Sequence, residues 1–253
     1  MIYLHPIGGL GNMFFQIASI WTLAKDNCDD LYLLNVEDNI IHLIKDKNRK
    51  QAVKYEYFFN RFSVKNDYID NKLQYPFYYI PLIYKTEYEY LGYFQCEKYF
   101  KHRRIEILEL FKPTEKINSE INKYKNLFSN ISVHVRRGDY VNAIVNVTQP
   151  IEYYRNALAQ LPNDLKVLIF SDDLKWCKEN FIGDRYVFID EIDYISIYLM
   201  SKMKYHVIAN SSFSWWSAWM SEYDDKIIIT PKMWFGKNTV YDGDLIPENW
   251  IRI

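Results

Sequence analysis

The second half of the chain alternates between short apolar runs and segments with a helical pattern, and this alternation limits the possible folds more than any other feature. The apolar runs predict strands at 131–135, 166–170, 186–189, 205–209 and 226–230. The segments between them predict helices at 151–161, 174–181, 195–203 and 213–221. Near-continuous apolar strands joined by helices are typical of a parallel sheet covered on both faces. We therefore expect an α/β, Rossmann-like domain.

The first half is less regular but begins in the same way. Residues 1–5 predict a strand, 12–25 a helix and 31–36 a second strand, whereas 45–51 predicts a polar loop. Residues 75–94 are crowded with aromatic side chains and broken by Pro76 and Pro81. The polar segment 112–126 predicts a linker. Two α/β halves of similar size, facing a cleft that suits a ligand, are the expected architecture.

Composition excludes several classes of protein. The 253 residues carry a net charge of −1, so no overall field attracts nucleic acid or an anionic membrane. The odd set of Cys28, Cys96 and Cys177 is widely spaced and predicts no disulfide framework, which favours a reducing, cytoplasmic location. Neither a secretory signal nor a membrane-spanning stretch is predicted.

Two adjacent arginines, Arg136 and Arg137, follow the predicted strand 131–135 in the sequence HVRRGDY. Gly138 allows a turn there, and ligands of open α/β sheets bind at the carboxyl ends of strands. A guanidinium group matches phosphate oxygens with two parallel hydrogen bonds and stays charged. The pair therefore predicts an anion site, and an internal ion pair between Arg137 and Asp139 is the alternative.

The sequence ANSSFSWWSAW (209–219) predicts the end of a strand followed by a helix. Ser211 or Ser212 can cap that helix, whose free N–H groups form a potential phosphate site. These two serines and the adjacent Phe213 are candidates for ligand contact. Three tryptophans in the helix are better explained by core packing: Trp215, Trp216 and Trp219.

Two weaker motifs also follow predicted strands. In FSDD (170–173), Asp172 and Asp173 can accept hydrogen bonds from a base or ribose, but helix capping by Ser171 or Asp172 explains the motif equally well. The glycine-rich sequence GGLGN (8–12) resembles a nucleotide-binding turn without the full G-x-G-x-x-G pattern. A tight strand-to-helix turn is its simpler explanation.

Two further patterns favour no site. Asp242-Gly-Asp244 looks like a metal-binding D-x-D, but its position in a loop near the carboxyl terminus favours a solvated turn. The basic run 101–104 (KHRR) is typical of a solvated helix face.

Taken together, these motifs resemble the α-1,2-fucosyltransferases of glycosyltransferase family 11. The matching pieces occur in the family's order and span most of the chain: GGLGNMFFQIA (8–18), GYFQCEKYF (92–100), HVRRGDY (134–140), FSDD (170–173) and LMSKMKYHVIANSSFSWWSAW (199–219). The resemblance implies a GT-B-like α/β fold, with an acceptor-side domain at 1–126 and a GDP-sugar-binding domain at 127–253. It also implies inverting transfer of L-fucose from GDP-β-L-fucose, without a required metal or other cofactor.

The resemblance places residues in roles. Arg136 is expected on the donor diphosphate, with His134 and Asp139 completing the catalytic motif; Asp139 is the first candidate base and His134 the second. The donor-binding set expected is Arg136, Arg137, Asp172, Asp173, Asp193, Ser211, Ser212, Phe213, Gly9, Gly11 and Asn12. The expected acceptor is a galactose-containing oligosaccharide or lipid-linked glycan, with peripheral membrane association as a possibility and no nucleic acid partner.

Two positions depart from the family pattern. Met13 stands where the family usually has glutamine, and Ser196 stands where many members have aspartate. In related fucosyltransferases an acid in this area reads the guanine, and Asp193 is the candidate substitute. Three alternatives stay open: a different GDP-sugar or linkage, a non-catalytic nucleotide- or glycan-binding module, and a metal-dependent D-x-D transferase.

Overall fold

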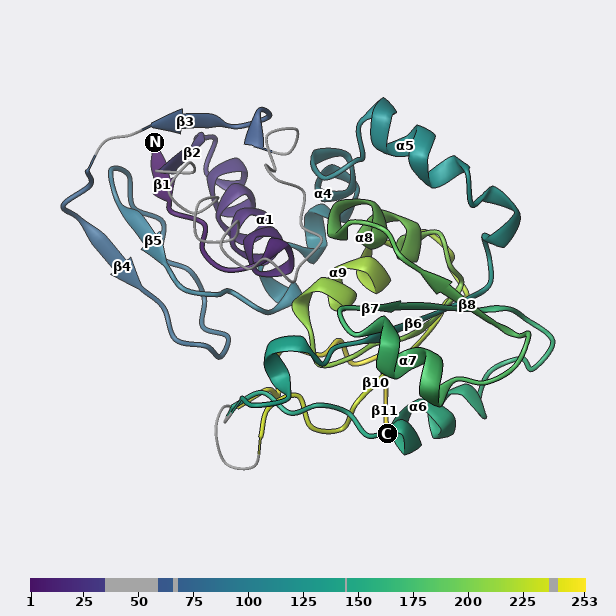
Figure 1. Cartoon of the computed structure of the whole chain (residues 1–253). Coiled ribbons are helices and arrows are strands. Elements are labelled where there is room, and N and C mark those ends of the chain that lie inside the picture. The colour runs from purple at the N-terminus through teal and green to yellow at the C-terminus, as the bar shows by residue number, and fades with distance from the viewer. Residues whose placement is uncertain (35–58, 66–67, 144, 237–240) are drawn as a thin grey trace. The chain divides into compact units, whose positions relative to one another are not determined.

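A computed structural model of the chain describes residues 1–34, 59–65, 68–143, 145–236 and 241–253. The chain divides into two compact units, each built on its own parallel sheet (Figure 1). The first unit comprises Met1–Lys112 and Tyr241–Pro247, and the second comprises Pro113–Val240 and Glu248–Ile253. The predicted loop 45–51 and residues 35–36 of a predicted strand lie outside the described residues. The predicted α/β class with two Rossmann-like halves is confirmed.

Among its described residues, the first unit has five parallel strands in the order β3-β2-β1-β5-β4. Its elements are β1 (Ile2–Leu4), α1 (Leu10–Asp26), β2 (Leu31–Leu34), β3 (Ser63–Lys65), β4 (Lys72–Gln74), β5 (Glu89–Leu91), η1 (Glu97–Tyr99), η2 (Lys101–Arg103) and α4 (Arg104–Leu110). Helix α1 is apolar around most of its surface and is accordingly buried in the core. Its Phe14 stacks on Phe111, just after α4, with ring centroids 4.4 Å apart.

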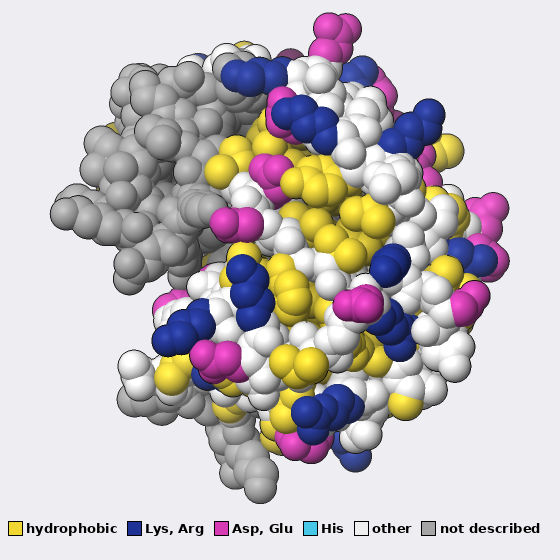
Figure 2. All heavy atoms as spheres, turned by 45° about the vertical axis from the view of Figure 1, so that its right-hand side comes forward, with side chains coloured by type: hydrophobic (Ala, Val, Ile, Leu, Met, Phe, Trp, Pro, Cys, Tyr) yellow, Lys and Arg dark blue, Asp and Glu magenta, His cyan; other side chains and the backbone are white. Residues whose placement is uncertain are grey.

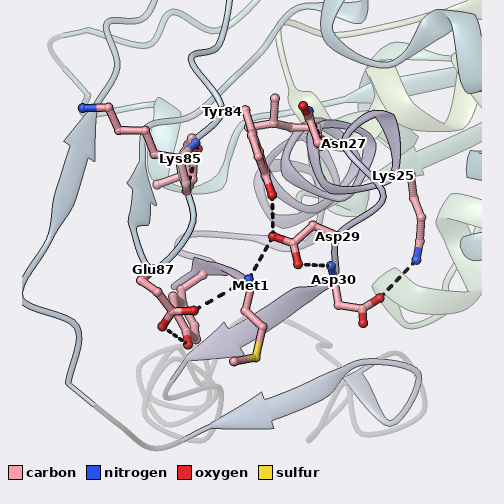
Figure 3. A network of polar contacts seen from close by, with 11 residues as sticks. Met1, Lys25, Asn27, Asp29, Asp30, Tyr84, Lys85 and Glu87 are labelled. Carbon is pink, nitrogen blue, oxygen red and sulfur yellow. Dashed lines mark hydrogen bonds and ion pairs between the residues drawn. The ribbon is translucent and has the colours of Figure 1, made fainter.

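A polar network fastens the start of β1 to the turn between α1 and β2 (Figure 3). The Asp29 carboxylate lies 2.9 Å from the amino group of Met1 and accepts a 2.9 Å hydrogen bond from the Tyr84 hydroxyl. Glu87 accepts a hydrogen bond from the Tyr3 hydroxyl at 3.0 Å. Burial raises the pKa of Asp29, but its contacts with the Met1 amino group, the Asp30 N–H and the Tyr84 hydroxyl outweigh this and lower it.

The described part of the second unit has six parallel strands in the order β11-β10-β9-β6-β7-β8. Its elements are α5 (Glu115–Asn122), η3 (Lys125–Leu127), β6 (Ile131–Val135), η4 (Gly138–Tyr140), α6 (Ile151–Leu158), β7 (Val167–Ser171), α7 (Leu174–Asn180), β8 (Tyr186–Ile189), α8 (Asp193–Ser201), β9 (Tyr205–Val207), α9 (Ser212–Met220), β10 (Ile227–Thr230) and β11 (Ile251–Arg252). The sequence predicts no strand after 226–230, but the short β11 follows it and pairs with β10. Its two residues are too few to give a sequence signal.

Helices cover both faces of this second sheet, with α6 and α7 on one side and α8 and α9 on the other (Figure 1). Successive side chains of β6 point alternately to the two faces of the sheet. Ile131, Val133 and Val135 join the core formed with α6 and α7. Ser132 and His134 point to the other face, where the Ser132 hydroxyl lies 3.0 Å from Nδ1 of His206. The strand therefore delivers the residues after Val135 to the carboxyl edge of the sheet.

The segment predicted as a linker contains α5, which packs against α8 within the second unit. Thr114 caps α5 by accepting a hydrogen bond from the Ile117 N–H. Among the described residues, no helix combines the length and apolar character that a membrane span requires. The three cysteines are free thiols.

Candidate functional site

Arg136 is the first residue beyond the carboxyl end of β6. Its Nη1 lies 2.8 Å from Oδ2 of Asp172, which follows β7, and its Nη2 donates to Oδ1 of Asp139 at 2.5 Å. The guanidinium carbon lies 5.1 Å from the centroid of the Tyr140 ring. The Arg136 side chain is 18% exposed. Two carboxylates from different elements thus hold one partly buried cation.

Arg137 turns to a different set of partners. Its Nε donates to Oδ2 of Asp173 at 3.1 Å, and its guanidinium carbon lies 4.3 Å from the centroid of the Trp176 ring on α7. The alternative predicted from the sequence, an ion pair between Arg137 and Asp139, is wrong in its partners, because Asp139 contacts Arg136. The strand's alternation sends the two neighbouring side chains in different directions.

The two aspartates of FSDD have separate roles in the structure. Asp173 is the N-cap of α7 and accepts from the Trp176 N–H at 3.1 Å, so the prediction of Ser171 or Asp172 as the cap is wrong. The Ser171 hydroxyl accepts from the Asp173 N–H at 2.9 Å. Asp172 accepts the Arg137 backbone N–H at 2.9 Å. It therefore connects the ends of β6 and β7.

Gly138 allows Asp172 to approach this closely. A Cβ on Gly138 would lie 2.6 Å from Oδ2 of Asp172, closer than side-chain carbons pack. A side chain at position 138 would therefore have to displace the Asp172 carboxylate.

Asn210 precedes Ser211 and Ser212, the serines predicted to contact a ligand. It hydrogen-bonds to several loops at the same edge of the sheet. Its Nδ2 donates to the carbonyls of Val147 and Trp234 at 2.9 and 2.8 Å. Its Oδ1 accepts from Gln149, and its carbonyl accepts a 3.3 Å hydrogen bond from the Tyr140 hydroxyl. Sequence reasoning missed this residue, although a polar side chain directly after a buried strand was a usable signal. Through Tyr140, η4 is brought to the segment that leads into α9.

Helix α9 runs from Ser212 to Met220, one residue earlier at each end than the predicted helix 213–221. Ser211 occupies the N-cap position without a side-chain capping bond, and Ser212 is the first helical residue. Phe213 follows, and its ring centroid lies 5.4 Å from that of His134. The tryptophans are buried in the core, which confirms their predicted packing role: Trp215, Trp216 and Trp219.

His134, the second candidate base, lies inside the protein. Its residue surface is 6% exposed, and burial together with the charge of Arg136 lowers its pKa to about 3. Among the residues that the structure describes, its Nδ1 has no hydrogen-bond partner. A buried imidazole that holds a proton so weakly is neutral at physiological pH and accepts protons poorly.

The glycine-rich sequence lies in the first unit, between β1 and α1. Gly9 is the N-cap of α1, and Gly8 has a positive φ of 83°. Gly11 lies within the first turn of α1. The Asn12 Oδ1 accepts a hydrogen bond from Gln95 at 2.8 Å. The tight strand-to-helix turn is therefore present, and a contact of Gly9, Gly11 or Asn12 with the donor stays a prediction.

Gln16, which sequence reasoning passed over, holds this turn in place. It accepts from the Ile7 N–H at 2.9 Å and donates to the Ile7 carbonyl at 2.8 Å. Its side chain is fully buried on α1. Two hydrogen bonds to one backbone unit fix the path of the chain before the glycines.

The basic run 101–104 forms ion pairs at the protein surface. Lys101, His102 and Arg103 lie close to acidic partners: Glu97, Asp26 and Glu106. Figure 2 likewise shows positive and negative side chains interspersed over the face that it presents. On the part of this face that Figure 2 colours by charge, the charges are mixed and form no broad positive patch.

Asp244 of the D-x-D pattern is not simply solvated. Its Oδ1 lies 2.8 Å from Nζ of Lys98, and its Oδ2 accepts from the Tyr79 N–H at 3.2 Å. The bond with Lys98 lowers the pKa of Asp244. Over the described ranges, no group of three or more potential metal ligands is found.

Comparison with known proteins decides the family. The model of glycosyl transferase family 11 matches residues 4–253. The chain belongs to this family. An α-1,2-colitosyltransferase of Escherichia coli is 35% identical over 186 residues, covering 67% of this chain and 63% of that protein. The O-antigen biosynthesis glycosyltransferase WbnK of Escherichia coli is 27% identical over an alignment of 298 residues, covering 97% and 98%.

The fold has a solved counterpart in the fucosyltransferase NodZ from Bradyrhizobium. The two chains superpose with a TM-score of 0.55 at 13% identity, over 86% of this chain and 92% of that one. Structures of NodZ, an α-1,6-fucosyltransferase, were obtained with GDP and after soaking with GDP-fucose. At this identity the likeness shows a shared fold.

Both departures from the family pattern are buried side chains. Met13 is fully buried on α1. Ser196 is also buried, and its hydroxyl donates to the Glu191 carbonyl at 3.3 Å. Asp193 begins α8 and accepts from the Tyr194 N–H at 2.7 Å. Whether Asp193 replaces the missing acid in guanine recognition stays a prediction.

Proposed function

We propose that this family 11 glycosyltransferase is an inverting α-1,2-fucosyltransferase. It transfers L-fucose from GDP-β-L-fucose to a hydroxyl of a galactose residue in an oligosaccharide or lipid-linked glycan, without a metal. Family membership supports the reaction class, and the colitosyltransferase relative supports the α-1,2 linkage. We further propose that the first unit binds the acceptor and the second unit binds the GDP-sugar, in the cytoplasm.

The observation that carries the proposal is the Arg136 guanidinium at the carboxyl end of β6. Tyr140 hydrogen-bonds to the segment before α9, so the N-terminal end of α9 belongs to the same edge of the sheet. A guanidinium and a helix N-terminus both favour an oxyanion. Together they would stabilise the charge that grows on a departing GDP.

The reaction balances with the groups proposed. The bond from the sugar C1 to the diphosphate oxygen breaks through an oxocarbenium-like state, and its electron pair leaves with GDP. The acceptor oxygen forms the new bond on the opposite face of C1, which converts the β-linked donor into an α-linked product. Asp139, whose side chain is 51% exposed, is the proposed acceptor of the hydroxyl proton. The buried His134 suits this role less.

A second donor, GDP-colitose, is favoured by the 35% identical colitosyltransferase. Colitose is the 3-deoxy form of L-fucose, so the two donors share the same diphosphate, C1 chemistry and leaving group. A pocket built around the 3-hydroxyl would discriminate strongly against the deoxy sugar, because polar groups would be left unpaired. The two donors therefore have to be compared directly.

The test is an incubation of the protein with each GDP-sugar and a panel of terminal β-galactosides, with and without EDTA. We expect α-1,2-linked product by mass spectrometry and NMR, higher kcat/KM with GDP-fucose, and no loss of turnover in EDTA. Arg136→Ala should abolish transfer while the protein stays folded.

The alternatives give different results. GDP-sugar binding without product would support a non-catalytic module, and product only from GDP-colitose would replace the proposed donor. Loss of activity in EDTA that added metal restores would support a metal-dependent transferase. A linkage other than α-1,2 would overturn the regiochemistry alone.

A further inference from the structure

Three carboxylates surround two guanidinium groups at the carboxyl ends of β6 and β7. Asp139 and Asp172 contact Arg136, and Asp173 contacts Arg137. The formal charge of this cluster is therefore −1, although the proposed ligand is an anion. A diphosphate would meet net repulsion there unless one carboxylate moves away when it binds.

The two carboxylates on Arg136 are held very differently. Asp172 is 15% exposed, and it also accepts the backbone N–H of Arg137 and packs against Gly138. Asp139 is 51% exposed and lies in the single 3₁₀ turn η4. An exposed ion pair contributes little, whereas a mostly buried carboxylate with further hydrogen bonds is costly to remove. Asp139 is therefore the partner that can leave.

The geometry of the guanidinium group points the same way. Asp172 contacts Nη1, whereas Asp139 contacts Nη2. The third nitrogen, Nε, is buried and has no hydrogen-bond partner among the described residues. Nε and Nη2 form one edge of the planar guanidinium, and this edge binds two phosphate oxygens through parallel hydrogen bonds. A single carboxylate oxygen on Nη2 leaves that edge half satisfied.

We propose that Asp139 occupies the place of the donor diphosphate on Arg136 when the site is empty, and that the diphosphate displaces it. Asp172 stays in place as a positioning residue that aims the Nε–Nη2 edge of Arg136 at the ligand. This proposal rests on the proposed function and specifies how its donor site works. It also assigns Asp172 to Arg136, instead of to a base or ribose or to the helix cap, the two roles that the sequence leaves open.

The test measures GDP binding by isothermal titration calorimetry, independently of turnover. Asp139→Asn should bind GDP roughly two- to fivefold more tightly than wild type, the range expected for the loss of an exposed ion pair. Asp172→Asn should bind GDP roughly tenfold more weakly or worse, because Arg136 loses its fixed partner. Each variant removes one negative charge beside the same guanidinium, so a general field effect would tighten both.

Two further variants serve as controls. Asp173→Ser removes a third charge from the cluster but keeps an N-cap residue for α7. It should change GDP affinity less than Asp139→Asn does. Gly138→Ala keeps every charge and pushes against Asp172, so it should weaken GDP binding as Asp172→Asn does. Thermal unfolding of each variant identifies any that fail to fold. If Asp172→Asn does not fold, Gly138→Ala takes its place in the comparison.

The outcomes separate this proposal from the proposed function. Unchanged or weaker GDP binding by Asp139→Asn, or tighter binding by both Asp172→Asn and Gly138→Ala, would overturn the exchange while leaving a GDP-dependent transferase intact. Equal tightening by Asp139→Asn and Asp173→Ser would also overturn it, because a long-range field would then explain both. No GDP binding by the wild-type protein would overturn both proposals.

Discussion

At the scale of single residues, Arg136 and Arg137 show how neighbours in sequence acquire different surroundings. Arg136 is gripped by two carboxylates and keeps one guanidinium edge incompletely paired. Arg137 is stacked on Trp176 of α7 and paired with Asp173, the N-cap of that helix. Its positive charge is therefore already balanced by a carboxylate within the protein. The first arginine is accordingly the one suited to a ligand.

Exchange of each arginine for lysine tests this difference. Arg136→Lys keeps the charge but loses the planar edge, so we expect kcat/KM for the GDP-sugar to fall roughly 10²- to 10³-fold, the range seen when an oxyanion-stabilising donor is lost. Arg137→Lys should reduce kcat/KM less, within about tenfold, and destabilise the protein by about 1 kcal/mol through lost stacking. Steady-state kinetics and denaturant unfolding measure the two effects. Equal losses of activity would contradict the division of roles.

At the scale of elements, helix α1 depends on a polar residue that the hydrophobic pattern does not explain. Gln16→Met keeps a similar volume but leaves the Ile7 N–H and carbonyl without their partner. We expect a loss of about 2–4 kcal/mol in unfolding free energy of the first unit. Thr22→Val is the matched control on the same helix, because the buried Thr22 hydroxyl has no partner among the described residues.

The control variant should be neutral or slightly stabilising, since it removes a buried polar atom that gains nothing in the fold. Urea denaturation followed by tryptophan fluorescence and circular dichroism measures both. Similar destabilisation by the two variants would mean that α1 responds to any change in its buried face.

At the scale of the whole molecule, two buried histidines make stability depend on pH. Burial lowers the pKa of His134 and of His206 to about 3, with Arg136 and Lys226 adding to the effect. An unfolded histidine titrates near 6.5, so the unfolded chain binds more protons below that pH. The stabilisation is fully present above pH 6.5 and is lost progressively as the pH falls towards 3.

The expected loss between pH 7 and pH 5 is about 2 kcal/mol for each histidine. His134→Leu should remove its share, so the variant's unfolding free energy should fall less steeply over this interval than that of wild type. Urea unfolding at the two pH values measures the slopes, whatever the absolute stability of the variant. Identical slopes for wild type and variant would contradict a neutral, buried His134.

Many of the strands, helices and buried residues were predictable, because the periods of strands and helices are local properties of the chain. The run ISVHV gives β6 without error, and the tryptophans of α9 are buried as their apolar bulk predicts. Local patterns are less accurate for the residue at which a helix begins, because that residue depends on a few backbone angles. The cap of α7 is Asp173 instead of Ser171 or Asp172, because the chain turns one residue later than the motif suggests.

The sequence by itself determines the two α/β halves, the position of the arginines after β6 and the likeness to family 11. Alternating side chains and apolar runs act over a few residues, so they can be read directly from the chain. Only the tertiary structure decides that Asp139 and Asp172 share Arg136, that Asp173 takes Arg137 and that Asn210 draws the loops together. Asp172 and Asp173 follow a different strand from the arginines, so these pairings depend on which strands are neighbours in the sheet. Asp139 is only three residues from Arg136, and the turn η4 brings it there.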